Sequence, residues 1–328
     1  MRVRTVTLLT LPFAPVAKLA VIGTGFTGTS IALALRPSKL FSEIAGYDWE
    51  RSALQAARHL GAVDVETRSA AQAVEGAAVV LVCVPSAKLP AAFDAMAASL
   101  AAGAVVSDTS LWKVAAASAA EAALPDTVHF IGGRPVLDAV EEPSGSAFAG
   151  AIYCLTPGPG ASEEAINAMS TVVTAAGAQP YFLDPAEHDA LTAATELLPP
   201  AVLATALAAL TSDPSWPDAG KLAGPAFDRL ATLADSLDAT FWETAGTNSA
   251  ALARWLEATA SALLDLRDRL QSAERANVAP TWPDTLAALA RWRHDRRQLQ
   301  EPTMPPMSDL KPNLFGNWPR FGSRSRPG

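Results

Sequence analysis

Short apolar segments alternate with helix-like segments between Lys18 and Asp184, and this alternation restricts the fold more than any other feature of the chain. Continuous apolar strands with helices between them are typical of a parallel sheet covered on both faces. We therefore predict an α/β domain with a doubly wound parallel sheet over residues 18–184. The expected strands are KLAVIG (18–23), EIAGYD (43–48), AVVLVCVP (78–85), AVVSDTS (104–110), VHFIGG (128–133), AIYCLTP (151–157) and QPYFLD (179–184).

The β-like segments end at Asp184. Residues 185–300 contain Ala/Leu-rich segments with apolar residues three or four positions apart, as in helices. We predict a helical substrate and dimerisation domain here, forming a homodimer because apolar helix faces need a partner. Residues 301–328, rich in Pro, Gly and Ser, are expected to be a flexible tail. Residues 1–17 are an extension that loosely imitates a signal peptide, although Pro12 and Pro15 interrupt its apolar run.

The composition excludes several classes of protein. A net charge of −8 argues against a nucleic-acid partner, and an apolar content of 50% excludes a disordered chain. The most apolar stretch, Leu197–Leu210, is too short to cross a membrane, so no membrane partner is expected. Cys83 and Cys154 lie in apolar β-like segments, which predicts buried free thiols in a reducing compartment, the cytoplasm. With only four histidines in the chain, we expect no metal site.

A glycine-rich turn joins the first predicted strand to the first predicted helix. The pattern GxGxxG is weak alone, but here it has a strand before it and a helix after it. The first glycine permits a tight turn, the second lets the backbone approach a pyrophosphate, and the third lets the helix pack closely on the strand. The turn predicts a Rossmann-type dinucleotide site made by Gly23, Thr24, Gly25, Phe26, Thr27 and Gly28.

Asp48 ends the next predicted strand, 20 residues after Gly28. An acid at this point accepts hydrogen bonds from the ribose hydroxyls and repels a 2′-phosphate, which favours NAD. Arg51 follows closely and leaves NADP open as the cofactor. The segment VCVPSAK (82–88) ends another strand, so Val84, Pro85 and Ser86 are candidates for the nicotinamide side. An ordinary strand-to-loop proline is the alternative there.

Several segments resemble one family, the prephenate and arogenate dehydrogenases of tyrosine biosynthesis. The similarity starts at VIGTGFTGTSIALAL (21–35) and fades after FWETAGTN (241–248). It runs through GYD (46–48), VVSDTSLWK (105–113), HFIGGRP (129–135), YCLTP (153–157) and AEHDALTAATELLPPAVLATAL (186–207). The resemblance implies an NAD(P)-dependent oxidoreductase that oxidises prephenate or arogenate, both small-molecule carboxylates, with loss of carbon dioxide.

The resemblance also implies a substrate site after the strand at 104–110. In the family an Asp is followed five residues later by a Lys, with a Ser between them facing the substrate; Asp108 and Lys113 keep this spacing. The family serine falls on Leu111, and Ser110 lies one position earlier. Lys113 would pair with a substrate carboxylate or polarise a hydroxyl. The alternative is that it caps a helix or forms a surface ion pair.

Arg134 is a departure from the family pattern. The family reads Gly-x-His-Pro, and its histidine takes the proton of the substrate hydroxyl; this chain reads Gly132-Gly133-Arg134-Pro135. Arginine stays protonated at any working pH and cannot be that base, although it can bind a carboxylate through two parallel hydrogen bonds. The alternative is that Arg134 pairs with Glu141 or Glu142 and never meets substrate.

The start of the predicted long helix holds another candidate. His188 and Asp189 match the family's His-Asp pair, and His188 could accept a proton, although a structural histidine is the alternative. Where the family often carries Ser-His-Leu-Pro-His, this chain has Glu196-Leu197-Leu198-Pro199-Pro200, which is expected to kink the helix. Arg229 loosely matches a family arginine that helps to hold substrate, whereas Trp242, Trp255 and Leu256 are expected to pack or to form an interface.

Three functional hypotheses remain open from the sequence. The chain is a prephenate- or arogenate-type dehydrogenase with altered site residues, an NAD(P)-dependent dehydrogenase of another carboxylate, or a non-catalytic NAD-binding dimer.

Overall fold

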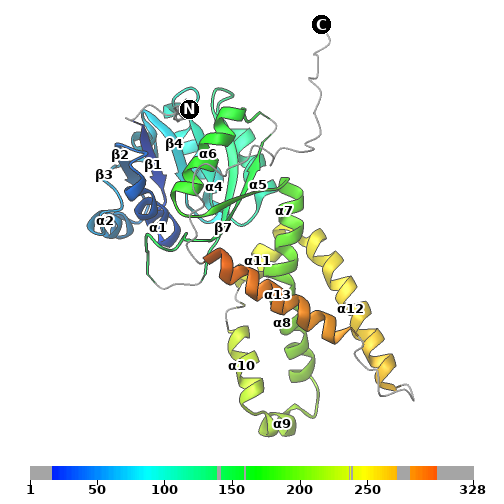
Figure 1. Cartoon of the computed structure of the whole chain (residues 1–328). Helices are drawn as coiled ribbons and strands as arrows, with labels where there is room; N and C mark the ends of the chain where they lie inside the picture. The colour runs from blue at the N-terminus through cyan, green and yellow to red at the C-terminus, as the bar shows by residue number, and fades with distance from the viewer. Residues whose placement is uncertain are drawn as a thin grey trace, which may run out of the picture.

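The computed structural model of the chain describes residues 17–138, 142–158, 160–235, 237, 239–271 and 281–300. A sheet flanked by helices forms the first part, and an elongated set of helices extends away from it (Figure 1). The predicted tail 301–328 and residues 1–16 of the predicted extension lie outside the described residues.

The described part of the chain forms an eight-stranded sheet in the order β3-β2-β1-β4-β5-β6-β7-β8. All pairs are parallel except β6 and β7, which are antiparallel, so the predicted α/β fold with a parallel sheet is confirmed, with one antiparallel pair among the described strands. The short strand β3 was not predicted. The strands are β1 (Lys18–Ile22), β2 (Glu43–Tyr47), β3 (Val65–Glu66), β4 (Ala77–Val82), β5 (Val105–Asp108), β6 (His129–Val136), β7 (Ile152–Pro157) and β8 (Gln179–Phe182).

The helices of the described chain are of two kinds: those that connect strands of the sheet, and those after β8, where the described residues form no further strand. They are α1 (Phe26–Leu35), α2 (Arg51–His59), α3 (Ala70–Val74), α4 (Leu89–Met96), α5 (Lys113–Ala123), α6 (Glu163–Ala175), α7 (Pro185–Thr192), α8 (Leu198–Thr211), α9 (Trp216–Ala219), α10 (Pro225–Ala234), α11 (Ala239–Thr247), α12 (Ser249–Gln271) and α13 (Trp282–Gln300).

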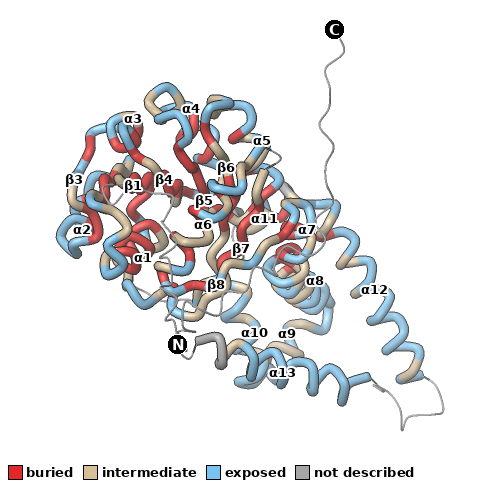
Figure 2. The backbone as a smooth tube through the Cα atoms, turned by 45° about the horizontal axis from the view of Figure 1, so that its top comes forward, coloured by how far each residue is buried: buried red, intermediate tan, exposed pale blue. Residues whose placement is uncertain are grey.

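Both faces of the sheet are covered by buried apolar side chains, because successive residues of a strand point to opposite faces. In β1, Leu19 and Val21 join the core under α1 and α6, whereas Ala20 and Ile22 join the core under α3, α4 and α5. Figure 2 shows burial concentrated in this part of the molecule. Because β1, β4 and β5 are parallel neighbours, their carboxyl ends lie at the same edge of the sheet, where ligands bind in such folds.

A single long helical segment leaves the sheet. α7 continues through a π-helical turn, Ala193–Leu197, into α8, which has proline in its first turn. Leu198 donates its N–H to the carbonyl of Ala193, five residues earlier, which is the hydrogen bond that defines a π turn. The pair Pro199-Pro200, predicted to kink the helix, therefore stands where its hydrogen-bond pattern changes.

This segment alters the expectation about membranes. The apolar stretch Leu197–Leu210 is part of a longer helix, Pro185–Thr211, with 27 continuous residues and a mean hydropathy of 1.5 in its most apolar window. Among the described residues it is the one helix long and apolar enough to cross a membrane. Only 17% of that window is buried, so the apolar side chains of α8 are left uncovered within one copy of the chain.

A small third core fixes the helices to the sheet. Trp112, from the loop before α5, packs with Leu197 of the π turn and Leu252 of α12. The indole N–H of Trp255 donates to the carbonyl of Ala190 at 3.3 Å, tying α12 to α7. The expectation that Trp255 serves packing is in accord with these contacts.

Candidate active site

The glycine turn between β1 and α1 has the geometry that its spacing predicts. Gly23 has a φ of +91°, and a Cβ there would lie 2.4 Å from the carbonyl oxygen of Cys83. A Cβ on Gly28 would lie 1.9 Å from the carbonyl oxygen of Gly23. A Cβ on Gly25 would meet no atom within 4 Å. The first and third glycines are thus required by the fold, and the second leaves open space beside the backbone.

This open space lies at the start of α1. Gly25 is the N-cap residue, no side chain caps the helix, and no acidic residue stands in its first turn. Free N–H groups at such a helix start attract a phosphate. The residues from Gly23 to Gly28 therefore fit the phosphate groups of a dinucleotide.

Asp48 stands beside this turn, immediately after β2. Its carboxylate accepts hydrogen bonds from the Thr24 N–H at 2.6 Å and from the Thr24 hydroxyl at 3.2 Å, and its other oxygen accepts from the Glu50 N–H at 2.8 Å. Arg51 begins α2. The acid is thus held next to the phosphate cradle, as expected for a residue that faces a ribose.

The segment after β4 borders the same turn. Val84 lies 2.9 Å from the position that a Cβ of Gly23 would take, and Cys83 donates its N–H to the carbonyl of Ile22. Pro85 precedes a short 3₁₀ turn that begins at Ser86. The structure therefore brings the predicted nicotinamide-side residues next to the glycine turn.

Lys113 begins α5 and its side chain is fully buried, so its ion pair with Asp108 is an internal one and not the surface ion pair given as the alternative. Its ammonium group contacts the Asp108 carboxylate at 2.5 Å and the Gly133 carbonyl at 2.6 Å, with the Ser110 hydroxyl 3.5 Å away. Ser110 also donates its hydroxyl to Asp108. Burial lowers the pKa of Lys113 and outweighs the opposing effect of Asp108.

Asp189 links α7 to the start of α5. Its two carboxylate oxygens accept hydrogen bonds from the N–H groups of Lys113 at 2.8 Å and Val114 at 3.0 Å. The His188 Nδ1 lies 2.9 Å from the same carboxylate. The other ring nitrogen, Nε2, is buried and has no hydrogen-bond partner among the described residues. The His188 ring is therefore inaccessible to solvent in this conformation.

Arg134 points from β6 toward the π turn. Its guanidinium donates to the Thr192 hydroxyl at 2.9 Å and contacts the Glu196 carboxylate at 3.1 Å. The predicted alternative, pairing with Glu141 or Glu142, is not what the structure shows for the described residue Glu142, and Glu141 lies outside the described residues. Glu196 and Thr192 were not predicted as site residues.

Cys154 lies opposite Arg134 in the pairing of β6 with β7. Burial raises the pKa of the Cys154 thiol, and the charges of Arg134 and Lys113 partly offset that effect. The two cations and this thiol thus share one region above the ends of β5 and β6.

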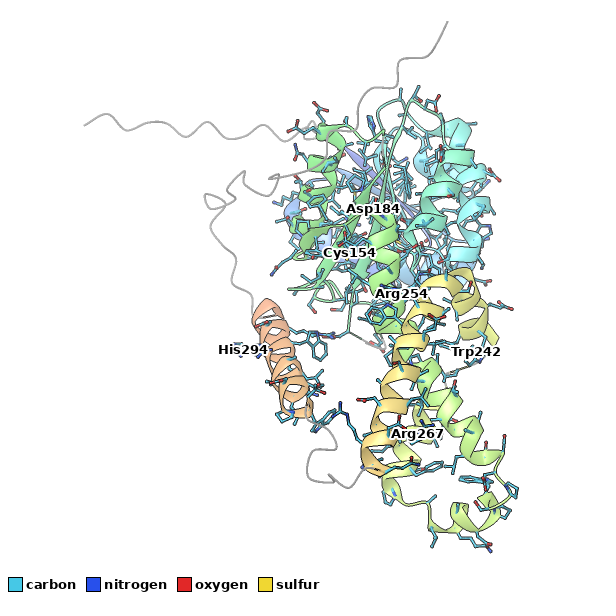
Figure 3. The ribbon with its side chains drawn as sticks, turned by 90° about the vertical axis from the view of Figure 1, so that its right-hand side faces the viewer. Cys154, Asp184, Trp242, Arg254, Arg267 and His294 are labelled. Atoms are coloured by element: carbon cyan, nitrogen blue, oxygen red, sulfur yellow. The ribbon has the colours of Figure 1, made fainter. Side chains whose placement is uncertain are left out.

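Arg229 does not join this group within one copy of the chain. It is exposed on α10, which lies with α9 at the far end of the helical part (Figure 1). Figure 3 shows Trp242, Arg254 and Arg267 on the helical part and Cys154 and Asp184 on the sheet part. Trp242 is 47% exposed, consistent with the expectation of an interface rather than a site.

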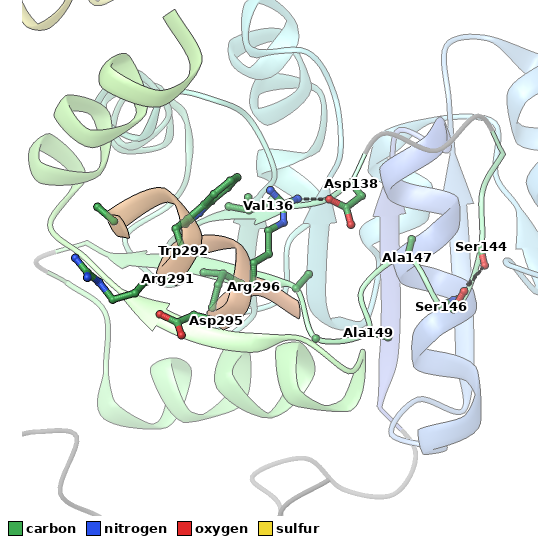
Figure 4. Close-up of a pocket in the computed structure, with 14 residues that line it drawn as sticks. Val136, Asp138, Ser144, Ser146, Ala147, Ala149, Arg291, Trp292, Asp295 and Arg296 are labelled. Atoms are coloured by element: carbon green, nitrogen blue, oxygen red, sulfur yellow. Dashed lines mark hydrogen bonds and ion pairs between the residues drawn. The ribbon is translucent and has the colours of Figure 1, made fainter. Parts of the chain in front are cut away.

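Two cavities lie near the site residues. One of about 840 Å³ opens between the β6–β7 connection and α13, where Arg296 forms an ion pair with Asp138 (Figure 4). The other, of about 250 Å³, lies beside Trp112 and Asp189, between α5, α7 and α12. Neither is lined by Arg134 or Glu196.

Comparisons with known proteins agree with this architecture. Residues 31–182 match the family model described as prephenate dehydrogenase, nucleotide-binding domain. The prephenate dehydrogenase of Bacillus subtilis is 27% identical over 188 residues, 56% of this chain and 51% of that protein. A probable prephenate dehydrogenase of Streptomyces niveus is 29% identical over 272 residues, 80% of this chain and 72% of that protein. The chain therefore spans about half the length of the Bacillus relative in their match.

The fold is shared with a solved structure. Prephenate dehydrogenase from A. aeolicus, in complex with hydroxyphenyl propionate and NAD+, superposes with a TM-score of 0.69 at 22% identity. The superposition covers 86% of this chain and 98% of that one.

Proposed function

We propose that this chain, whose residues 31–182 match the nucleotide-binding domain of prephenate dehydrogenases, is an NAD-dependent dehydrogenase of tyrosine biosynthesis that oxidises prephenate or arogenate with loss of carbon dioxide. The observation that carries the proposal is the glycine turn, whose open second glycine and uncapped helix start fit a dinucleotide. When bound, the nicotinamide supplies the hydride acceptor for this reaction.

The cofactor is NAD rather than NADP. Asp48 is fixed beside the glycine turn, where its negative charge attracts ribose hydroxyls and repels a 2′-phosphate. Arg51, at the start of α2, is the residue through which NADP would be accommodated. Val84, Pro85 and Ser86 border the nicotinamide end of the same crevice.

A carboxylate of the substrate is held by Arg134, at the end of β6. The Arg134 side chain is 12% exposed, and its five N–H groups can donate to a substrate carboxylate in addition to Thr192 and Glu196. Lys113 is fully buried, and its ammonium group and the Ser110 hydroxyl both contact Asp108, so they hold the end of β5 in place. Arg229 contributes only if a second copy brings its α10 to this crevice.

The chain acts as a homodimer in the cytoplasm. Its helical part exposes large apolar side chains, among them Leu210, Leu263, Leu264 and Leu270, which a second copy would cover. Light scattering on the purified protein should give about twice the chain mass of 34.1 kDa. A mass of one chain at micromolar concentration would contradict the dimer.

Two other functional hypotheses remain because Arg134 cannot serve as a base in the position where the family has histidine. One is a dehydrogenase of a different carboxylate, and the other is an NAD-binding dimer without catalysis.

Turnover separates the three. Purified protein should form NADH from NAD+ with prephenate or arogenate, measured by absorbance, and NADP+ should be a poorer acceptor. Oxidation of other hydroxy acids but of neither of these substrates would favour the second hypothesis. Calorimetric binding of NAD+ with no turnover of any acid would favour the third.

A further inference from the structure

We propose that Glu196 is the proton acceptor of this enzyme, in place of a histidine. The inference rests on the proposed dehydrogenase function and deepens it, because it assigns the base that oxidation of a hydroxyl requires. It is carried by the placement of Glu196 against Arg134 at the end of β6.

The other ionisable groups at this edge of the sheet are poorly suited to the task. Arg134 remains protonated, and Lys113 is fully buried against Asp108 and the Gly133 carbonyl. Asp108 accepts hydrogen bonds from Ser110 and from the Gly133 N–H, and it is also fully buried. Their proton-accepting atoms are already used within the protein.

The side chains of His188 and Asp189 on α7 are equally unavailable to accept a proton from a substrate. Both carboxylate oxygens of Asp189 accept backbone N–H groups from α5, and His188 is 1% exposed. A base must come within about 3 Å of the hydroxyl whose proton it takes. His188 could do so only if the residues that bury it moved, whereas a substrate can approach the half-exposed Glu196 without such a movement.

Glu196 is accessible and held in a defined direction. Its side chain is 46% exposed, and one carboxylate oxygen contacts the Arg134 guanidinium at 3.1 Å, which leaves room for a second partner. Arg134 is in turn fixed by the Thr192 hydroxyl, one helical turn before Glu196. The arginine thus orients the carboxylate.

The π turn accounts for this placement. Glu196 lies within Ala193–Leu197, where the helix takes an extra residue before Pro199 and Pro200. Short π turns of this kind occur frequently at functional sites. The segment Glu196–Pro200, which lacks two histidines of the family pattern, therefore supplies the carboxylate of Glu196. This carboxylate contacts Arg134, which stands where the family has another histidine.

The chemistry balances. The C–H bond of the carbinol carbon breaks and its hydride passes to NAD+, while the O–H proton passes to the carboxylate of Glu196. The bond to the ring carboxylate then breaks, releasing carbon dioxide, and its electron pair becomes part of the aromatic phenolate. The phenolate takes the proton back, so Glu196 ends the cycle ionised.

The test is the turnover of Glu196→Gln, which keeps the contact with Arg134 but cannot accept a proton. With NAD+ and the substrate that the wild-type protein oxidises, kcat should fall by about 10²–10⁴-fold. Glu196→Asp should keep measurable activity, and formate added to Glu196→Ala should restore part of the rate. NAD+ binding by calorimetry should be unchanged in all three variants, which shows that they are folded.

Matched variants separate this role from others. Glu187→Gln, exposed on α7, should leave turnover unchanged, and His188→Asn, which can still donate to Asp189, should keep turnover within about tenfold. The proposal is overturned if Glu196→Gln retains wild-type kcat, or if His188→Asn alone abolishes turnover and imidazole restores it. A wild-type protein that binds NAD+ but oxidises neither substrate would instead overturn the proposed function.

Discussion

The glycine turn and the Arg134–Glu196 contact lie at the same edge of the molecule, but they are specified in different ways. The turn is made by six consecutive residues whose backbone leaves no room for side chains at Gly23 and Gly28. The contact is made by side chains from β6 and the π turn, and Arg134 is also held by Thr192 of α7, 58 residues further along the chain. A site built by backbone geometry leaves a fixed pattern in the sequence. A site built by distant side chains can change its residue types, provided that the partners change together.

The sharpest test of this contrast is Lys113, whose side-chain contact with Asp108 is fully buried. Lys113→Met should lower the free energy of unfolding by about 3–5 kcal/mol, because it leaves the buried Asp108 carboxylate without its cation. Urea titration followed by circular dichroism measures the loss. Lys88→Met, at an exposed lysine, is the control and should change stability by less than about 0.5 kcal/mol. A loss below about 1 kcal/mol for Lys113→Met would mean that this buried contact is replaceable after all.

The next test compares two glycines within the turn. Gly28→Ala should destabilise the fold by about 1–3 kcal/mol or more and abolish NAD+ binding, because the new Cβ meets a backbone carbonyl. Gly25→Ala should leave the melting temperature within a few degrees, since its Cβ meets no atom. It should nevertheless weaken NAD+ binding by at least tenfold, measured by calorimetry, because the methyl group occupies the space for the pyrophosphate. Equal effects of the two substitutions on stability would contradict the assignment of separate roles.

The smallest effect concerns alkaline pH. Burial raises the pKa of the Cys83 thiol from 9.0 to about 12, so the folded chain holds this proton more tightly than the unfolded chain does. The resulting stability is fully present below pH 9 and is lost as pH rises toward 12, by at most about 1.4 kcal/mol per pH unit. Unfolding in urea at several pH values should show this slope, and Cys83→Ala should reduce it. Asp265→Asn, in an exposed ion pair of α12, should leave the slope unchanged.

Much of the sheet could be predicted because its strands are buried on both faces and read as continuous apolar segments. β3 could not, because Val65 and Glu66 are exposed and carry no such signal. The antiparallel direction of β7 could have been inferred from the connection between β6 and β7, although the apolar pattern of the strand itself does not show it. The described residues between β6 and β7, 137–138 and 142–151, include no helix, and a parallel pair needs a crossover that is usually a helix.

The candidate site was predictable only on its cofactor side. The turn, Asp48 and the segment after β4 follow from local spacing, whereas the partners of Lys113 and Arg134 depend on how α7 crosses the ends of β5 and β6. Glu196 was visible as a departure from the family's pattern, but its contact with Arg134 requires the π turn. The local sequence does not predict the π turn, because two adjacent prolines indicate only that regular helical hydrogen bonding is interrupted.

The π turn has one more consequence, for the tolerance of this chain to changes in length. An α-helix has about 3.6 residues per turn, and the π turn Ala193–Leu197 places one residue more within a single turn. Removing one residue there should therefore restore regular α-helical hydrogen bonding while α8 keeps its direction. A deletion that a straight α-helix would transmit to every later residue would here be confined to the turn and to its contact with β6.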